Sequence, residues 1–267
     1  MVFRIATWNI NSVRLRAPQV VRFLSEEQPD VLCLQETKCP PGQFPTAAFH
    51  EAGYHHICDI GQSGYHGVAI VSKHPFVATG SRQFCGKDDA RHVSVRLAGP
   101  ELTVHNFYVP AGGDEPDPAL NEKFAHKLSF LNEMTRWLGG KDSRKDGASI
   151  LVGDLNIAPL EHDVWSHKEL LKVVSHTPIE IENLQKLMHA GGFDDSMRRV
   201  IPAHEKLYTW WSYRARDWEA SNRGRRLDHI WARDGVEDRV RNIRIRKDCR
   251  GWERASDHVP VIADFDI

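Results

Sequence analysis

Short apolar runs alternate with stretches of helical spacing along most of the chain. Short apolar runs bounded by polar residues are typical of buried strands. They predict strands at residues 2–8, 31–34, 68–71, 93–97, 102–109 and 150–152 and, in the C-terminal third, at 208–213, 226–232, 240–245 and 259–265. Apolar residues at helical spacing predict helices at residues 17–27, 120–138 and 180–190.

This order of elements predicts one α/β domain over residues 1–267, with helices covering its sheets. No internal repeat or low-complexity tract interrupts it, and 267 residues with 41% hydrophobic side chains can bury a full core. Residues 111–118 are rich in Gly, Pro and acids, and residues 139–147 also read as a linker or a mobile surface loop.

The first residues carry no targeting or membrane signal. Arg4 interrupts the first apolar run and no long apolar stretch follows, so we expect no membrane association and a cytoplasmic protein, acting at the nucleoid if the source is bacterial. The five cysteines are odd in number and lack Cys-x-x-Cys spacing, which argues against a disulfide framework and a zinc site.

The net charge of −1 gives no support to nucleic-acid binding, but the charges are unevenly distributed. Residues 213–255 hold 13 Arg and Lys against 8 Asp and Glu. This basic segment either faces a polyanion or forms a solvated surface of arginine-edged strands, and charge alone does not decide between the two.

Polar side chains follow the predicted strands where each should leave the core. One such strand end usually marks only the arrival of the chain at water, but six together suggest a site, because α/β folds build sites at strand ends. The strand ends carry Asn9, Gln35-Glu36, Tyr108, Asp154 and Asn156, Asp228, and Asp257-His258.

These residue types suit a hard cation and phosphodiester hydrolysis. Carboxylates and amides supply oxygen ligands, which favour Mg²⁺ or Mn²⁺ over zinc. A metal with an acid, an amide and a histidine can activate water and relieve charge on a phosphate. Asp228 and His258 suit a pair in which the acid orients the imidazole. The candidate oxygen ligands are Glu36, Asp154, Asp257, Asn9 and Asn156.

Six segments of the chain resemble, in order, the exonuclease III family of apurinic/apyrimidinic endonucleases. The resemblance implies a deoxyribonuclease I-like α/β fold, a four-layer sandwich of two packed mixed β-sheets flanked by helices, with the site at one edge. The segments are Thr-Trp-Asn-Ile-Asn at 7–11, Leu-Gln-Glu-Thr-Lys at 34–38, Tyr-Val-Pro at 108–110, Gly-Asp-Leu-Asn-Ile-Ala-Pro at 153–159, Arg-Leu-Asp at 226–228 and Ser-Asp-His-Val-Pro at 256–260.

The resemblance also implies the activity: a metal-dependent DNA phosphodiesterase of base excision repair that cuts duplex DNA 5′ to abasic sites. A 3′ to 5′ exonuclease and a 3′ end-cleaning activity are further expectations, and we expect a monomer. Glu36 would be the principal metal ligand, with Asn9 and Asp257 completing the shell directly or through water.

The same resemblance implies roles for the other strand-end residues. Asp154 would handle the proton of the attacking water or of the leaving oxygen, and Asn156 would hold the phosphate or that water. Tyr108 would contact a phosphate oxygen or assist the leaving group. His258, supported by Asp228, would stabilise the charged transition state. Which group is the general base stays open, because coupled acids around a metal exchange roles.

Family members select a base-free sugar with an aromatic wall. Asn11, Trp210 and Leu227 are the candidates for substrate contact, although paired tryptophans in a strand are also ordinary core residues. Arg225 stands where some relatives have an aromatic residue, so an element of the sugar pocket is missing or is replaced by a phosphate-contacting cation. Residues 111–117 are acidic where a DNA-gripping loop would be basic, so this loop stays clear of the backbone or discriminates between duplexes.

Two alternatives to an abasic-site endonuclease differ from it in substrate or in activity. A general nuclease or another phosphodiesterase of the superfamily would keep the metal chemistry and act on RNA, a lipid headgroup or an inositol phosphate. Glu36 followed by Thr37-Lys38 and the basic segment count against these substrates. A catalytically dead DNA-binding protein ranks last, because every expected catalytic residue type is present.

Overall fold

Strands and helices alternate along the chain, and the computed structural model describes residues 2–141, 143 and 147–267. The strands are β1 (Val2–Asn9), β2 (Val31–Gln35), β3 (His56–Ile60), β4 (Val68–Ser72), β5 (Phe76–Gly80), β6 (His92–Leu97), β7 (Thr103–Tyr108), β8 (Ser149–Asp154), β9 (Asp194–Asp195), β10 (Trp210–Trp211), β11 (Gly224–Arg225), β12 (Asp228–Arg233), β13 (Val240–Ile245) and β14 (Val261–Asp266). The α-helices are α1 (Val13–Glu27), α2 (Thr46–Glu51), α3 (Glu122–Leu138), α4 (His167–Leu170), α5 (Pro178–Gly191), α6 (Ser196–Val200) and α7 (Trp218–Ser221), and the 3₁₀ turns are η2 (Glu161–Asp163), η3 (Glu237–Arg239) and η4 (Lys247–Gly251).

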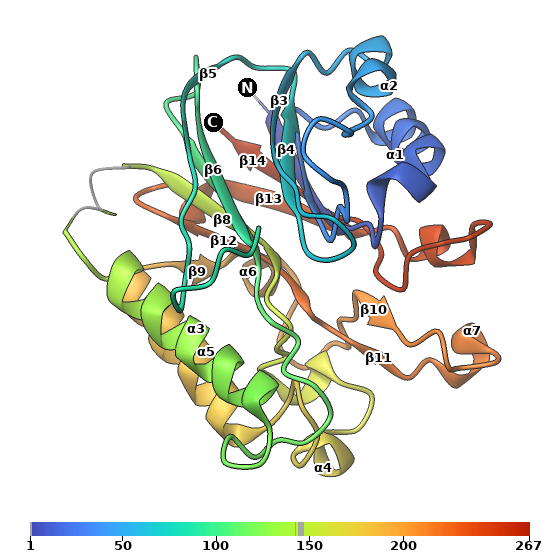
Figure 1. Cartoon of the computed structure of the whole chain (residues 1–267), viewed down its shortest axis with the longest axis vertical. Helices are drawn as coiled ribbons and strands as arrows, with labels where there is room; N and C mark the ends of the chain where they lie inside the picture. The colour runs from blue at the N-terminus through green and yellow to red at the C-terminus, as the bar shows by residue number, and fades with distance from the viewer. Residues whose placement is uncertain (1, 142, 144–146) are drawn as a thin grey trace.

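Two six-stranded sheets form the centre of the molecule, with the strand orders β13-β14-β1-β2-β4-β3 and β5-β6-β7-β8-β12-β9. Both sheets are mixed, because β1 and β2 are parallel and β7 and β8 are parallel while their other neighbours run antiparallel. The short hairpin β10-β11 stands outside both sheets (Figure 1). The expected fold class, two mixed sheets flanked by helices, is confirmed.

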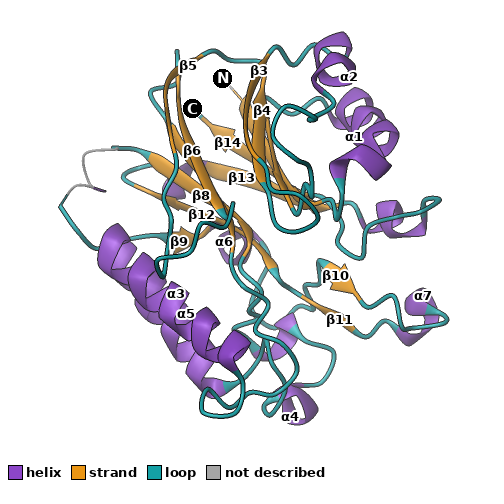
Figure 2. Ribbon diagram, viewed as in Figure 1, coloured by secondary structure: helices purple, strands orange, loops and turns teal. Residues whose placement is uncertain are grey.

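The layers follow from the alternation of side chains along each strand. In β1, Ile5 enters the core between the two sheets, while Trp8 faces the outer layer that holds α1 and α2. In β8, Val152 enters the same central core and Leu151 faces α3 and α5 on the opposite outer face. Figure 2 shows these helices on the two outer sides of the sandwich. Burial on both faces explains why these strands read as continuous apolar runs.

The three predicted helices are confirmed, with earlier starts for two of them. α1 begins at Val13, and Arg16 has non-helical angles that kink it just before the predicted start at residue 17. α5 begins at Pro178, a residue suited to the first turn of a helix. α3 begins at Glu122, two residues later than predicted, because the Asn121 side chain accepts a hydrogen bond from Lys123 N and caps the helix there.

Most predicted strands are confirmed, but residues 208–213 form a strand only at β10, so this prediction was too long. The reason is local: Thr209 Oγ1 accepts hydrogen bonds from the backbone of Leu227 and Asp228, which holds this segment beside β12 without a ladder. The edge strands β3 and β5 were missed because their exposed positions break the apolar pattern. Residues 142 and 144–146 of the expected loop at 139–147 lie outside the described residues.

Two further expectations concern cysteines and membranes. All five cysteines carry free thiols. In the described part of the chain, no helix has the length and apolarity needed to cross a membrane.

The two parallel pairs bring four strand ends to one edge of the sandwich. β1 and β2 end at Asn9 and Gln35, and β7 and β8 end at Tyr108 and Asp154. The buried Asn106 joins the two sheets below this edge: its amide oxygen accepts from Gln35 Nε2 at 2.7 Å. Its Nδ2 donates to two backbone carbonyls of the other sheet at 2.9 Å each. The register of the sheets therefore fixes where the polar strand ends meet.

Candidate active site

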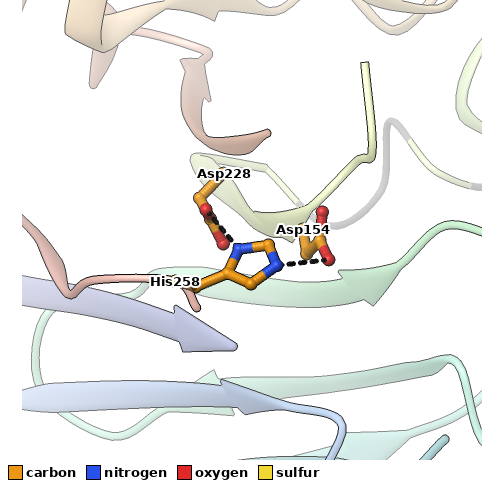
Figure 3. A group of neighbouring side chains, drawn as sticks. All are labelled: Asp154, Asp228 and His258. Carbon is orange, nitrogen blue, oxygen red and sulfur yellow. Dashed lines mark hydrogen bonds and ion pairs between the residues drawn. The ribbon is translucent and has the colours of Figure 1, made fainter. Parts of the chain in front are cut away.

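A buried histidine lies between two buried aspartates at this edge (Figure 3). His258 Nδ1 is 2.8 Å from Asp228 Oδ2, and His258 Nε2 is 3.6 Å from Asp154 Oδ2. Burial lowers the pKa of His258, but the charges of Asp228 and Asp154 outweigh burial and raise this pKa to about 10. Burial raises the pKa of Asp154 to about 7, against the opposing effect of the His258 charge. The imidazole is therefore held as a cation, and Asp154 titrates near neutrality.

Asn9 connects this group to Glu36. Its Nδ2 donates to Glu36 Oε1 and to Asp154 Oδ2, both at 2.8 Å, so one amide nitrogen lies between two carboxylates. Burial raises the pKa of Glu36, but the charge of Lys38 and the hydrogen bond from Asn9 lower it below its ordinary value. Glu36 is therefore an anion at neutral pH. Asn9 faces the two carboxylates with its nitrogen and accepts from Asn11 N with its oxygen.

Asp257, next to His258 in the chain, is held by two side chains. Its Oδ1 accepts from Asn11 Nδ2 at 3.2 Å and its Oδ2 accepts from Trp210 Nε1 at 2.9 Å. Asn11 Oδ1 in turn accepts from Lys38 Nζ at 2.6 Å. Asn11 and Trp210, both expected to contact substrate, thus also orient a carboxylate of the site.

Tyr108 closes the site from the end of β7. Burial and the charges of Glu36 and Asp154 raise its pKa well above the ordinary value. The phenol therefore stays protonated near neutral pH and can donate a hydrogen bond. Arg91 lies over its ring, with the guanidinium carbon 4.9 Å from the centroid, and donates to Tyr108 O at 3.2 Å.

The turn from Gly153 to Asn156 depends on two unusual backbone conformations. Gly153 has φ 137°, and a Cβ placed on it would lie 2.0 Å from Phe107 O, so only glycine fits. Asn156 has φ 55°, and its backbone N donates to Asp154 Oδ1 at 3.0 Å. Its Nδ2 donates to Val109 O at 2.9 Å and to Asp154 Oδ2 at 3.2 Å. The turn thereby fixes both oxygens of Asp154.

The segment carrying His258 is tied to β1 by two hydrogen bonds, and a third lies within the segment. Ser256 Oγ donates to Asn9 O at 2.7 Å and accepts from His258 N at 3.2 Å. Trp8 Nε1 donates to His258 O at 3.1 Å. Residues that are almost 250 positions apart in sequence therefore form one rigid unit.

A cleft of about 670 Å³ opens onto these groups. Its lining includes Tyr108, Asp154, Asn156 and His258, together with Trp210, Leu227 and Arg225. Three of the four substrate-contact candidates thus line the cleft together with the candidate catalytic groups. Asn11 contacts the site from behind Asp257 instead.

The basic residues of the segment 213–255 lie in two kinds of environment: some form ion pairs with acids of the protein, and others line the cleft. Arg226 is fully buried and pairs with Asp163 and Asp195, while Arg246 pairs with Glu26, Glu27 and Asp248. In contrast, the cleft is lined by Arg214, Arg223 and Arg225. Ion pairs therefore account for part of the segment, and whether the cleft arginines face a polyanion stays a prediction.

The acidic loop after Pro110 also reaches the cleft. Ala111, Gly113 and Asp114 are among its lining residues. The loop is tied down at Gly112, whose carbonyl accepts from Asn121 Nδ2 at 2.9 Å. Asp114 therefore places a negative charge at the cleft wall.

The donor set fits a divalent cation. Glu36 and Asp154 supply carboxylate oxygens on either side of Asn9 Nδ2, and hard cations prefer such oxygens. The ligand atoms of Asp154, Asp228 and His258 also lie within 4.8 Å of one another. That group, the Asp228–His258–Asp154 relay, is better explained as an imidazolium held by a hydrogen bond to Asp228 and an ion pair with Asp154. Glu36 remains the more open ligand.

The sequence model of the endonuclease/exonuclease/phosphatase family matches residues 6–258. The chain belongs to this family. An exodeoxyribonuclease III from Haemophilus influenzae is 31% identical over 272 residues, which span 98% of this chain and 99% of the relative. The solved structure of an AP endonuclease from Archaeoglobus fulgidus is 33% identical with a TM-score of 0.91, and the match covers 99% of this chain and 100% of that one.

A third relative is a 3′ phosphatase from Neisseria, solved with a product DNA hairpin; it is 31% identical with a TM-score of 0.90 over 99% of this chain and 100% of that chain. These findings confirm the resemblance to the exonuclease III group within the family and the nuclease class of its relatives. They also agree with the fold seen here.

Three basic residues that contact side chains or backbone of the site were not among the predicted site residues. Lys38 contacts Glu36 Oε2 at 2.9 Å, and its signal was its place in the Gln-Glu-Thr-Lys motif. Lys127 is fully buried and donates to Asn156 O at 2.8 Å; its signal was a cation on the apolar face of a predicted helix. No motif or periodicity in the sequence indicated Arg91, which lies just before a predicted strand, where a charged residue usually lies at the surface.

Proposed function

We propose that this protein is a divalent-metal-dependent DNA phosphodiesterase of base excision repair, which cuts duplex DNA 5′ to abasic sites. The observation that carries the proposal is the buried Asp228–His258–Asp154 relay, joined through Asn9 to Glu36 at the floor of a cleft. Relatives named as an exodeoxyribonuclease and an AP endonuclease support this substrate class. A 3′ to 5′ exonuclease and a 3′ end-cleaning activity belong to the same proposal.

We assign the metal, Mg²⁺ or Mn²⁺, to Glu36, with Asp154, Asn156, Asn9 and Asp257 as further oxygen donors directly or through water. Such a cation supplies charge neutralisation on phosphate oxygens and a lower pKa for water. Lys38 Nζ contacts the outer oxygen of Glu36, so part of this negative charge is already balanced by the protein. Asn9 must turn its amide for its oxygen to reach a cation at Glu36.

We propose that His258 holds its proton throughout the reaction and faces the phosphate as an imidazolium. Its pKa of about 10 keeps it charged over the physiological range, and a fixed cation stabilises negative charge that develops on phosphate oxygens. Asp228 orients the ring through Nδ1 and balances its charge.

Asp154 and Tyr108 have complementary proton chemistry. With a pKa of about 7, Asp154 can take a proton from the attacking water or return one to the leaving oxygen near neutral pH. Tyr108 keeps its proton and donates a hydrogen bond to a phosphate oxygen or to the leaving group. Asn156, fixed in its left-handed turn, holds the phosphate or the water.

The substrate pocket is assigned to the cleft beside this group. Trp210 and Leu227 offer an apolar wall for a base-free sugar, and Asn11 acts through Asp257. We propose that residues 1–267 act as one catalytic unit and as a monomer on double-stranded DNA. The cytoplasmic location, and action at the nucleoid if the source is bacterial, remain predictions.

The proposal is tested by incision of a duplex with a single abasic analogue, compared with an intact duplex, in Mg²⁺ and in EDTA. We expect Mg²⁺-dependent cutting 5′ to the analogue that leaves a 3′ hydroxyl. Asp154→Asn should abolish most of it, whereas the matched variant Asp266→Asn, at the exposed end of β14, should not. Absence of cutting would refute the proposal, and equal cutting of both duplexes would favour a general nuclease.

A further inference from the structure

Arg225 projects into the cleft from the hairpin beside the relay. In the hairpin it pairs with Trp210, which forms an isolated bridge with His258 on its other side. The guanidinium carbon of Arg225 lies 5.3 Å from the centre of the Trp210 ring. Arg225 Nη1 donates to Val174 O at 3.0 Å and to Ser175 Oγ at 2.8 Å. The side chain is therefore held in one orientation by neutral acceptors.

The charge of Arg225 has no carboxylate counterpart within the described residues, where no ion pair to it is found. Its Nε is buried without a hydrogen-bond partner, and burial lowers its pKa. The adjacent Arg226 contrasts with it, because two aspartates contact that guanidinium and its pKa is raised. A half-buried cation without an anion is costly, so such a group is commonly completed by a ligand.

Glu180 is the acid whose charge acts on Arg225, but its carboxylate is already engaged. Lys127 Nζ contacts Glu180 Oε1, and the backbone N atoms of Ser175 and Thr177 donate to the same carboxylate at about 3 Å. Its oxygens therefore balance the buried lysine and cap the start of α5. The positive charge of Arg225 remains directed at the cleft.

We propose that Arg225 binds a second anionic group on the residue that is removed from the DNA, so the enzyme prefers ends whose leaving residue carries its own phosphate or carboxylate. The inference rests on the proposed function, because that function places the removed residue against Trp210 and Leu227. Water oxygen bonds to the scissile phosphorus, the bond from phosphorus to the 3′ oxygen breaks, and that oxygen takes a proton. Arg225 takes no part in these bond changes.

The chemistry of the guanidinium sets the expected class of ligand. Its planar N–H groups match the oxygens of a carboxylate or phosphate, and Nη2 is the donor that neither the neutral partners nor burial occupies. A neutral base-free sugar offers hydroxyl groups only and leaves the charge uncompensated. Hydrogen bonds to charged groups predict a preference of roughly 10- to 100-fold for the anionic substrate.

The test uses nicked duplexes that differ only at the blocked 3′ end. One ends in a tetrahydrofuran with a free hydroxyl, one in the same tetrahydrofuran bearing a 3′ phosphate, and one in a phosphoglycolate, which ends in a carboxylate. Cleavage is measured as kcat/KM in Mg²⁺, and binding is measured as Kd in EDTA at the same ionic strength. The phosphate and glycolate duplexes distinguish the two sources of negative charge.

For the wild type we expect anionic ends to be favoured by roughly 10- to 100-fold in kcat/KM, with a smaller preference in Kd. Arg225→Met should reduce this ratio to near one, and Arg225→Lys should leave an intermediate ratio because it keeps the charge but loses the planar donors. Arg241→Met, on the exposed side of β13, should keep the wild-type ratio.

A wild-type ratio near one, or an unchanged ratio in Arg225→Met, would overturn the inference. If the wild type cuts none of the duplexes, the proposed function fails, and the Kd ratios of the wild type and Arg225→Met still decide whether Arg225 binds the added anion.

Discussion

Replacing Asp228 by asparagine tests the charge state of the relay. The substitution keeps the size of the side chain and removes the negative charge 2.8 Å from His258 Nδ1. A rise in the His258 pKa from 6.5 to about 10 corresponds to about 5 kcal/mol in favour of the imidazolium. Of the acids that raise this pKa, Asp228 has the largest effect. Its loss should therefore remove roughly half of this free energy, about 2 to 3 kcal/mol. The His258 pKa should then fall by about two units.

The expected consequence is a rate loss that depends on pH. Below about pH 7 the imidazole stays protonated in both proteins, so the variant loses mainly the orientation of the ring. Above about pH 8 the variant deprotonates while the wild type does not, and the deficit should grow by roughly tenfold per pH unit. The assay is kcat on an abasic duplex from pH 6 to 10 with metal in excess. A loss of kcat that stays constant across this range, or no loss, would show that Asp228 does not keep His258 charged.

Stability of the metal-free protein provides an independent measurement of the same interaction. A histidine whose folded-state pKa is raised stabilises the folded protein below its unfolded pKa of about 6.5, and this contribution is lost as pH rises through about 10. Unfolding by urea in EDTA should therefore show the largest destabilisation by Asp228→Asn near neutral pH and a shrinking difference toward pH 10. A difference that grows with pH would contradict the assignment of His258 as a cation.

Three further substitutions test other parts of the site. Glu36→Gln should raise the metal concentration for half-maximal rate by at least about tenfold, and a titration with unchanged metal dependence would contradict its role as ligand. Lys127→Met should lower the free energy of unfolding by about 3 to 5 kcal/mol because Glu180 loses its partner. The double variant Lys127→Met/Glu180→Gln should regain part of this stability but keep a reduced kcat, because Asn156 O still lacks the lysine. Full recovery of kcat in the double variant would contradict a role of Lys127 in positioning Asn156. Gly153→Ala should cost about 3 kcal/mol or more in a urea titration, because its Cβ would overlap Phe107 O, and a loss below about 0.5 kcal/mol would contradict this reading of the turn.

The central strands were predictable because both of their faces are buried. Ile5 and Trp8 enter different cores, so β1 reads as one apolar run that ends at Asn9, where the chain reaches the site. The edge strands β3 and β5 lack a continuous apolar run because many of their side chains are partly or fully exposed to solvent. The start of α1 was missed because Arg16 interrupts the helix before Pro18, and sequence periodicity cannot register such a kink.

The candidate residues could be named from strand ends, but their contacts could not. Nothing in the local sequence indicates that Asn9 bonds to two carboxylates or that Trp210 donates to Asp257, since these contacts join segments that are distant in the sequence. The role of Lys127 could not be read from the sequence either. Its buried ammonium is explained only by carbonyl and carboxylate groups that the fold assembles around it.

Arg225 illustrates how a departure from the family pattern gains meaning from structure. In sequence it indicated either a missing pocket element or a cation that contacts phosphate. Its fixed orientation over Trp210 and the engagement of Glu180 elsewhere favour the second interpretation. The physical reason is charge balance, which depends on neighbours that are distant in sequence.

The most direct test of a single metal-assisted centre is the anomalous scattering of Mn²⁺ in crystals of the protein with a duplex that carries an abasic analogue. We expect a manganese peak bonded to a carboxylate oxygen of Glu36, with the phosphate 5′ to the analogue between that ion and His258. A manganese ion bound only at Asp228 and His258, or a phosphate placed away from both Glu36 and His258, would contradict it.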